Sequence, residues 1–460
     1  MNLFKKIPLS WLVEDPRIFQ VAADNIAHWL DYWFERQNLT PGLSVCIRQG
    51  DQTLLNKAWG VADAETGEAL SLSHMFRMAS QAKMLTADSI FLLQQDGRLN
   101  IHDTLGQHLP WLKQDSHIAA MTIADLLAHK SGIQRDGADA SFWSYDVPFP
   151  DNKKLQNDTN NLPPIDQSQR APLKYSNWGY TLLGQVIEAA SGMPYADFIQ
   201  ARILKPLGLS HTQADVTAEE VRGAPLAKGH GPWIRGRHAV INPAVPAEAF
   251  APAMGLTSTP EDMCKYLHAQ FNDDTSVLGK KSRLELSRHF DRDTPGAGLE
   301  FGFGRMRYRE FAPMTFIGHS GSFVGQDSFT YYEPQLQLAI SVAGNCNQFS
   351  KALLVESCLT AFLVHLQNQQ SFLKGSPLNG RYQDQRECYD IFETKDGVMT
   401  LEPGRDDCWQ KAGVLKKISR RAFAVDPASD PSRSGEPVVF TTQKGKTTLK
   451  FGGDRYQKIS

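Results

Sequence analysis

The stretch FRMASQAKMLTADSIFLLQQDG, from Phe76 to Gly97, sets a serine and a lysine three positions apart on a predicted apolar helix. Three residues advance about 4.5 Å along a helix and return to nearly the same face, so Ser80 and Lys83 can touch. Burial disfavours a charged lysine, and a neutral lysine can take the proton of a serine hydroxyl. Free backbone N–H groups at the helix start can stabilise an oxyanion. The spacing alone is common, and by itself it favours an ordinary solvated lysine.

Two further segments supply polar groups that a reactive serine needs. PLKYSNWGYTLLGQVIEAASG sets Tyr175 and Asn177 at the start of a second predicted helix. A tyrosine hydroxyl can relay a proton to a leaving group, and an amide can hold a substrate carbonyl. FIGHSGSFVGQDSFTYY sets His319, Ser320 and Gly321 on a predicted strand. A helix-cap tyrosine and a satisfied strand histidine are the alternatives, and each is preferred where its motif stands alone.

Taken together and in this order, S-x-x-K, Y-x-N and H-x-G resemble the serine β-lactamase and penicillin-binding protein superfamily. The branch of class C β-lactamases, family VIII esterases and D-aminopeptidases is the most similar. Three longer segments carry the same resemblance: TIADLLAHKSGI (Thr122 to Ile133), YSNWGYTLLGQVIEAASGMPYADFIQARILKPLGLSHT (Tyr175 to Thr212) and PAMGLTSTPEDMCKYL (Pro252 to Leu267). The resemblance implies an α/β (α+β) serine β-lactamase-like fold, in which helices flank an antiparallel sheet and a further region is all helical.

The resemblance also implies roles for individual residues. Ser80 is the expected nucleophile, and Lys83 and Tyr175 share the duties of general base and general acid as a coupled pair. Asn177 is expected to orient the substrate carbonyl and to contact Lys83.

The family's K-T-G strand corresponds here to His319, Ser320 and Gly321, which are expected to bind and orient the substrate. The backbone N–H of Ser322 would form the oxyanion hole with that of Ser80. β-Lactamases carry a lysine at position 319, where it helps to hold the carboxylate of the drug. Histidine is common at this position in the esterases and D-aminopeptidases, so we do not expect penicillin turnover to be the main activity. The family's lead-in PGT-x-F-x-YSN is replaced by RAPLKYSN, so the site edge at residues 172–174 is expected to differ.

The resemblance therefore implies a serine hydrolase that works through an acyl-enzyme, without a cofactor. The expected substrates are short-chain esters, or amides and peptides that carry a D-residue. The histidines show no H-E-x-x-H or paired spacing, so we infer no metal. Three alternatives remain: acyl transfer to an acceptor other than water, a β-lactamase, and a non-catalytic binding protein of the same fold.

The composition places the chain among ordinary globular proteins, with 460 residues, 41% hydrophobic and 21% charged. A net charge of −2 does not favour nucleic acid or an acidic membrane surface as a partner. The resemblance implies a small-molecule ester, amide or peptide as the substrate. The six cysteines lack C-x-x-C spacing and are expected to be reduced and buried. We see no secretory signal and expect a cytoplasmic protein, with a precursor trimmed before Met1 as the alternative. A homo-oligomer is left open.

The sequence divides into an N-terminal arm at residues 1–15, a β-lactamase-like hydrolase domain at residues 16–370 and a small C-terminal antiparallel β domain at residues 376–460. A helix is expected to begin at Asp15-Pro16, where proline suits the first turn. The polar segment from Asp136 to Pro172 is predicted to be a long functional or mobile loop. We expect the C-terminal domain to narrow the active-site cleft, with a folding or dimerisation role as the alternative.

Overall fold

The computed structural model describes residues 16–145, 147–163, 173–216, 225–241, 245–272, 277–288, 290–292, 299–308, 315–349, 351–367, 376–395, 397–404, 408–409, 412–419, 421–426, 435–451 and 454–459. The predicted N-terminal arm lies outside these ranges. The chain forms two compact units, residues 39–351 and residues 1–38 with 352–460. The domain boundaries drawn from the sequence stay predictions.

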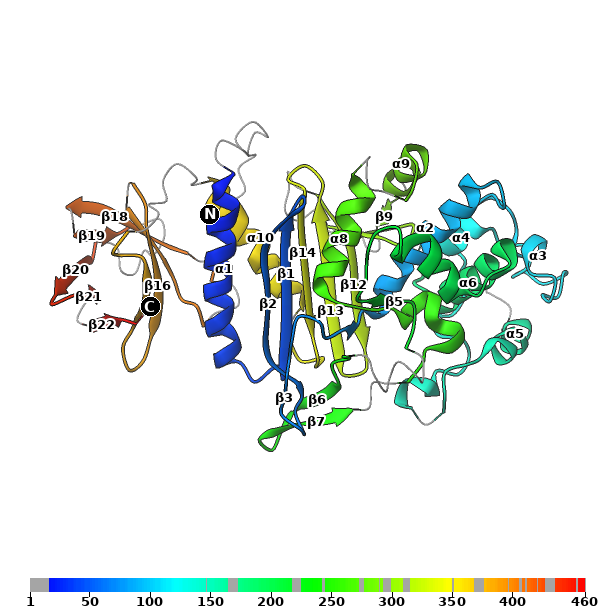
Figure 1. Ribbon diagram of the computed structural model, residues 1–460, viewed down its shortest axis with the longest axis horizontal. Helices are drawn as coiled ribbons and strands as arrows, with labels where there is room; N and C mark the ends of the chain where they lie inside the picture. The colour runs from blue at the N-terminus through cyan, green and yellow to red at the C-terminus, as the bar shows by residue number, and fades with distance from the viewer. Residues whose placement is uncertain are drawn as a thin grey trace. The chain divides into compact units, whose positions relative to one another are not determined.

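The larger unit is built on a nine-stranded sheet whose neighbouring strands are all antiparallel, as expected for this fold class. Its order is β3-β2-β1-β14-β13-β12-β11-β10-β9, and its middle strands run side by side in Figure 1. The bounds are β1 (Gly42–Gln49), β2 (Gln52–Asp63), β3 (Glu68–Ala69), β9 (Phe290–Arg292), β10 (Leu299–Gly302), β11 (Met306–Tyr308), β12 (Phe316–Phe323), β13 (Gln326–Glu333) and β14 (Leu338–Gly344).

The central strands are buried almost throughout, and helix α8 (Pro260–Phe271) packs against β1, β13 and β14. Gly50 lies in the turn between β1 and β2 with a φ of 55°, a conformation that costs glycine little. Two small sheets complete the unit: β4 (Phe76–Arg77), β8 (Thr257–Ser258) and β5 (Thr212–Gln213) form one, and β6 (Gly229–Ile234) and β7 (Arg237–Ile241) form the other.

Helix α2 (Ala82–Gln95) is the centre of the helical part, since every residue from Ala82 to Leu93 is buried. Its apolar sequence allows neighbours on all sides. The buried carboxylate of Asp88 is satisfied by Arg305 Nη2 at 2.5 Å and by the Tyr266 hydroxyl at 2.5 Å, so the charge is paired. The other helices of this unit are α3 (Leu105–His108), α4 (Ile123–Leu127), α5 (Asn152–Asn160), α6 (Asn177–Ser191), α7 (Tyr195–Ile199) and α9 (Lys280–Arg288).

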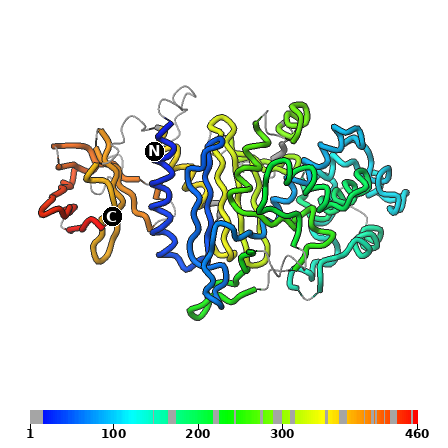
Figure 2. Tube along the Cα trace, in the orientation of Figure 1, coloured from blue at the N-terminus to red at the C-terminus, as the bar shows by residue number. Residues whose placement is uncertain are grey.

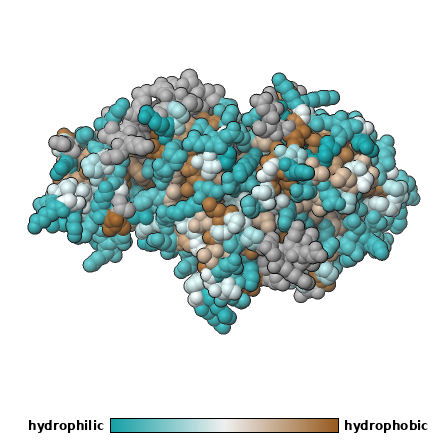
Figure 3. Space-filling model, viewed as in Figure 1, coloured by the Kyte–Doolittle hydropathy of each residue, from teal (hydrophilic) through white to brown (hydrophobic). Residues whose placement is uncertain are grey.

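The segment predicted as a long functional or mobile loop, Asp136 to Pro172, includes a helix, and residues 146 and 164–172 of it lie outside the described residues. It contains α5, whose first turn is capped because Asp151 Oδ1 accepts a hydrogen bond from the Lys154 N–H at 2.8 Å. α5 buries only Leu155 and Thr159, so its sequence lacks the apolar periodicity that would have identified a helix. Its outer residues are hydrophilic, and the right-hand end of Figure 3, where α5 lies, is correspondingly teal.

The second unit contains α1 (Arg17–Arg36), which confirms the helix predicted after Pro16, together with α10 (Lys351–Gln367) and an eight-stranded antiparallel barrel. Figure 2 shows the barrel strands in orange to red. Their bounds are β15 (Gly380–Gln383), β16 (Cys388–Glu393), β17 (Gly397–Leu401), β18 (Gly413–Ser419), β19 (Ala422–Val425), β20 (Pro437–Gln443), β21 (Lys446–Phe451) and β22 (Asp454–Lys458).

The predicted antiparallel β domain is therefore confirmed, and its eight strands close into a barrel. A hairpin turn at Lys444 and Gly445, which both have positive φ values, joins β20 to β21. Apolar side chains fill the barrel interior, so it is a packed core. On its outside, Arg381 forms a bidentate pair with Asp390 at 2.7 and 2.8 Å and also donates to the His28 carbonyl of α1 at 2.9 Å. All six cysteines of the chain are buried free thiols, as predicted.

Candidate active site

Ser80 lies in a 3₁₀ turn, Ala79–Gln81, that leads into α2. Ala79 has a φ of 49°, a strained value for a residue with a side chain, and this kink comes directly before the serine. Gln81 holds the turn in place by donating to Ser328 Oγ of β13 at 2.8 Å. Ala79 and Gln81 are buried while Ser80 is only partly so, and the turn therefore presents the serine hydroxyl at the start of the helix.

Lys83 is fully buried one turn after Ser80, and its amine nitrogen contacts three oxygen atoms. Nζ lies 3.1 Å from Ser80 Oγ and 2.8 Å from Asn177 Oδ1. Its third contact is the carbonyl oxygen of Ala253, at 2.7 Å, in a π-helical turn at Ala251–Gly255. Burial lowers the pKa of Lys83 well below its ordinary value of 10.5, and the positive charge of Arg135 acts in the same direction.

These contacts direct the lone pair of the neutral lysine. A neutral amine has two N–H bonds and one lone pair, whereas the ammonium ion has three donors. Asn177 Oδ1 and the Ala253 carbonyl can only accept hydrogen bonds, so they take the two N–H bonds. The remaining position faces Ser80 Oγ, whose hydroxyl can donate to the lone pair. The geometry suits proton transfer from Ser80 to Lys83.

The side chain of Tyr175 is hydrogen-bonded to that of Ser80. Its ring stacks on His129 with centroids 4.3 Å apart, and Lys83 Nζ lies 4.9 Å from the ring centroid. Desolvation raises the pKa of Tyr175 above its ordinary value of 10.0, and the hydrogen bond to Ser80 opposes that rise. The phenol is therefore neutral near pH 7 and able to donate a proton.

Asn177 is the first residue of α6 and uses both ends of its amide inside the site. Oδ1 accepts from Lys83, and Nδ2 donates to Asp136 Oδ1 at 2.6 Å. The preceding Ser176 caps the helix, because its Oγ accepts from the Gly179 N–H at 3.0 Å. The predicted contact between Asn177 and Lys83 is thus present, and its amide group reaches Asp136 as well.

His319, Ser320, Gly321 and Ser322 follow one another on β12. His319 is buried, and its ring centroid lies 6.4 Å from that of Tyr175. Ser320 contributes a different contact, since its Oγ lies 3.8 Å from Met306 Sδ on the neighbouring strand.

Gly321 explains how β12 reaches the serine. A Cβ at this position would clash with the carbonyl oxygen of Met78, two residues before Ser80, so only glycine allows this approach. Ser322, the next residue, therefore belongs to the part of β12 that runs along the turn carrying Ser80.

Three residues near Tyr175 escaped the sequence interpretation: His129, Arg135 and Asp136. His129 is buried, and its Nδ1 accepts a hydrogen bond from the Ser176 N–H at 3.1 Å. Burial lowers its pKa well below 6.5, with help from the charges of its neighbours, so it is a neutral support for the tyrosine ring. His129 belongs to the segment TIADLLAHKSGI that carries the family resemblance, and this was the available signal. Arg135 and Asp136 follow that segment with no motif of their own.

Within the described parts of the chain, no three His, Cys, Asp or Glu side chains gather closely enough to hold a metal ion. No helix in those parts combines the length and the apolar character needed to cross a membrane.

The chain is similar to known proteins along most of its length. The family model described as Beta-lactamase matches residues 30–355. Protein flp of Staphylococcus aureus strain N315 is 27% identical over 332 residues, which are 71% of this chain and 64% of the relative. This chain therefore spans about 64% of the length of that relative. The teichoic acid D-alanine hydrolase of Staphylococcus aureus is 26% identical over 304 residues, 66% of this chain and 70% of the relative.

Two solved structures share the fold. The octameric penicillin-binding protein homologue from Pyrococcus abyssi has a TM-score of 0.65 at 22% identity, covering 95% of this chain and 99% of the other. The D-amino acid amidase from Ochrobactrum anthropi SV3, complexed with L-phenylalanine amide, has a TM-score of 0.61 at 24% identity. That alignment covers 76% of this chain and 99% of the amidase.

Proposed function

This chain belongs to the beta-lactamase family of serine hydrolases, and we propose that it hydrolyses esters or amides of D-residues through an acyl-enzyme on Ser80. The observation that carries the proposal is the environment of Lys83, whose N–H bonds are taken by Asn177 and Ala253 while its third contact is the serine hydroxyl. A surface lysine would remain charged and could not act as a base at neutral pH.

In the acylation step, the O–H bond of Ser80 breaks and its proton passes to the lone pair of Lys83. Ser80 Oγ forms a bond to the substrate carbonyl carbon, and the carbonyl electron pair moves onto the oxygen. The backbone N–H groups of Ser80 and Ser322 are the proposed donors to this oxyanion. The bond to the leaving group then breaks, Tyr175 gives its proton to the leaving group, and Lys83 returns a proton to Tyr175.

Deacylation uses the same groups in reverse. A water molecule attacks the acyl carbon and gives its proton to the pair of Lys83 and Tyr175. The bond to Ser80 Oγ breaks, and Oγ takes the proton back while the carboxylic acid leaves. Transfer to an acceptor other than water would follow the same steps, with an amine or alcohol in place of water.

The substrate class rests on two relatives. One is named for the removal of D-alanine from teichoic acid, and the other is a D-amino acid amidase. Both names favour a substrate with a D-residue, and the second favours an amide. The cytoplasmic location and a homo-oligomer stay predictions, with the octameric homologue as support for the second.

The proposal is tested with the p-nitroanilides of D-alanine and L-alanine, and with a D-alanyl ester. We expect the D-alanyl compounds to be hydrolysed at least about 10-fold faster than the L-anilide in kcat/KM, a difference of about 1.4 kcal/mol in transition-state binding. An equal or faster reaction of the L-anilide would contradict the substrate class. Turnover of p-nitrophenyl acetate without turnover of any alanyl compound would be consistent with the acyl-enzyme mechanism. It would exclude compounds of D-residues as the substrate class.

The β-lactamase alternative is tested at His319. Its imidazole offers one hydrogen bond but not the permanent charge of a lysine, so we expect slow hydrolysis of nitrocefin by the wild type. His319→Lys should raise kcat/KM for carboxylate-bearing substrates by about 10-fold, the scale of one charge-assisted hydrogen bond. Fast nitrocefin hydrolysis by the wild type would contradict the proposed effect of His319 on substrate preference.

The predicted role of the C-terminal barrel as a cap is tested by truncation after residue 375. We expect a folded protein that still cleaves p-nitrophenyl acetate but changes its preference along a series of longer acyl chains, because a cap acts on large substrates by sterics. Unchanged preference along that series would eliminate the cap. An insoluble product would favour a folding role, which the bond from Arg381 to the α1 backbone supports.

A further inference from the structure

Arg135 carries an exposed positive charge next to the proposed proton donor. Its guanidinium carbon lies 5.2 Å from the centroid of the Tyr175 ring, and its side chain is 67% exposed. Tyr175 in turn is hydrogen-bonded to Ser80. A single tyrosine side chain therefore separates this cation from the nucleophile, and the cation faces solvent.

The backbone that carries Arg135 is fixed to the start of α6. The Arg135 carbonyl accepts from the Trp178 N–H at 3.0 Å, and the adjacent Gln134 carbonyl accepts from Ser176 Oγ at 3.0 Å. These bonds tie the segment to the helix that presents Asn177. A guanidinium on a fixed backbone, resting on an aromatic ring, loses less conformational freedom on binding than one on a free loop.

The only ion pair that the described residues offer to Arg135 is a loose one. Its Nε lies 3.6 Å from Asp136 Oδ2, while Asp136 Oδ1 is already bonded to Asn177 Nδ2 at 2.6 Å. Among the described residues, none accepts a hydrogen bond from the terminal nitrogens of Arg135. Those two N–H edges have the fork geometry that matches a carboxylate or a phosphate.

An ordinary surface arginine is the alternative, stabilising the loop through Asp136 and the tyrosine ring. That role would be served by the Nε edge and the flat face alone. It leaves the terminal nitrogens of this exposed cation beside Tyr175 without an acceptor among the described residues. Lys174, another cation near this segment, donates a hydrogen bond to the Gly132 carbonyl at 3.0 Å.

We propose that Arg135 forms an anion-binding subsite that holds a carboxylate or phosphate group on the leaving-group side of the substrate. The inference rests on the proposed function, because it assigns the leaving group to the side of Tyr175. An anion on this side lies next to the group that protonates the departing oxygen or nitrogen. The substrate class is thereby narrowed to D-acyl esters or amides of an anionic alcohol or amine.

The test compares D-alanyl esters of three alcohols of similar size: glycerol, glycerol 1-phosphate and 3-hydroxypropionate. We expect the wild type to prefer one or both anionic esters in kcat/KM, with added salt reducing the preference because the cation is exposed. The comparison between the two anionic esters distinguishes a phosphate site from a carboxylate site.

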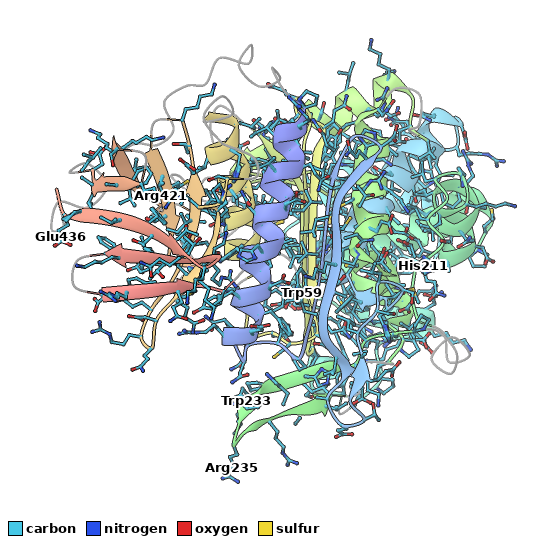
Figure 4. The ribbon with its side chains drawn as sticks, turned by 60° about the vertical axis from the view of Figure 1, so that its left-hand side comes forward. Trp59, His211, Trp233, Arg235, Arg421 and Glu436 are labelled. Carbon is cyan, nitrogen blue, oxygen red and sulfur yellow. The ribbon has the colours of Figure 1, made fainter. Side chains whose placement is uncertain are left out.

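Arg135→Gln should lower the ratio of kcat/KM for the preferred anionic ester to that for the neutral ester by about 10- to 100-fold, the scale of charge-assisted hydrogen bonds. Arg135→Lys should lower it less, since the charge stays and the fork is lost. Arg235→Gln is the matched control. Figure 4 shows Arg235 at the tip of the β6–β7 hairpin, pointing away from its unit, and the ratio should be that of the wild type.

Equal ratios in the wild type and Arg135→Gln, or a wild type without anionic preference, would overturn the subsite. Failure of the proposed function has a different signature, namely that no ester is turned over. Binding of the same three esters to a Ser80→Ala protein then decides the matter without turnover. The anionic ester should bind more tightly than the neutral one, and Arg135→Gln in that background should remove the difference. Equal binding of all three esters would contradict the subsite.

Discussion

Ser80→Ala should lose hydrolysis of p-nitrophenyl acetate and p-nitrophenyl butyrate by about 10⁴-fold or more in kcat, the scale seen when a serine nucleophile is removed. The reason is chemical: the alanine side chain cannot form the acyl-enzyme, and Lys83 is left without the hydroxyl that its lone pair faces. The fold should persist, because Ser80 is only partly buried and loses a single oxygen atom. Steady-state kinetics and a thermal unfolding midpoint measure the two effects.

Ser89→Ala is the matched control for this substitution. Ser89 lies on the same helix, and its hydroxyl donates to the Leu85 carbonyl at 2.8 Å, away from the contacts of Lys83. The loss of that bond costs stability by about 1 kcal/mol and should leave kcat close to that of the wild type. Near-wild-type turnover by Ser80→Ala, or an equal loss in Ser89→Ala, would show that the nucleophile has been assigned wrongly.

Lys83→Ala and Tyr175→Phe should each lower kcat by at least about 100-fold, and the double variant should lose much less than the product of the two effects. The structure gives the reason, since both side chains bond to the same serine hydroxyl and Lys83 Nζ lies 4.9 Å from the tyrosine ring. If one proton-transfer path runs through both side chains, either substitution blocks it, and the second substitution has little further effect on kcat. Strict multiplication of the two losses would exclude such a path.

The pH dependence of the wild type belongs to the same prediction. Lys83 must be neutral to act as a base, so kcat/KM should rise with pH through the pKa of the pair that Lys83 forms with Tyr175. Because burial lowers the pKa of Lys83 well below 10.5, this rise should be complete well below the pH at which an ordinary lysine titrates. An activity that rises only near pH 10 would mean that the lysine is solvated.

The local part of the site could be predicted from sequence, and the assembled part could not. Ser80 and Lys83 are one helical turn apart, so their contact follows from helix geometry. Tyr175 and Asn177 reach them from a distant segment, and only the family resemblance placed them there. Asp136 and Arg135 carry no periodic or motif signal, yet one bonds to Asn177 and the other rests on Tyr175.

The fold shows the same division. Helix α1 follows from apolar periodicity, and its predicted start at Asp15-Pro16 lies within two residues of the observed one. Helix α5 was missed because it buries only two side chains. The closure of the barrel was missed because it depends on pairing between β15 and β22, the first and last strands of the domain in sequence. Long-range strand pairing leaves no mark on either strand alone.

Labelling with a fluorophosphonate, followed by mapping of the modified peptide, is the direct test of whether Ser80 is the nucleophile. The reagent reacts with an activated serine and forms a stable bond to its oxygen, so it needs no knowledge of the substrate. We expect one modified serine, Ser80. Labelling should be lost in Ser80→Ala and slowed in Lys83→Ala. Modification of a different serine, or no modification of the folded wild type, would contradict this assignment.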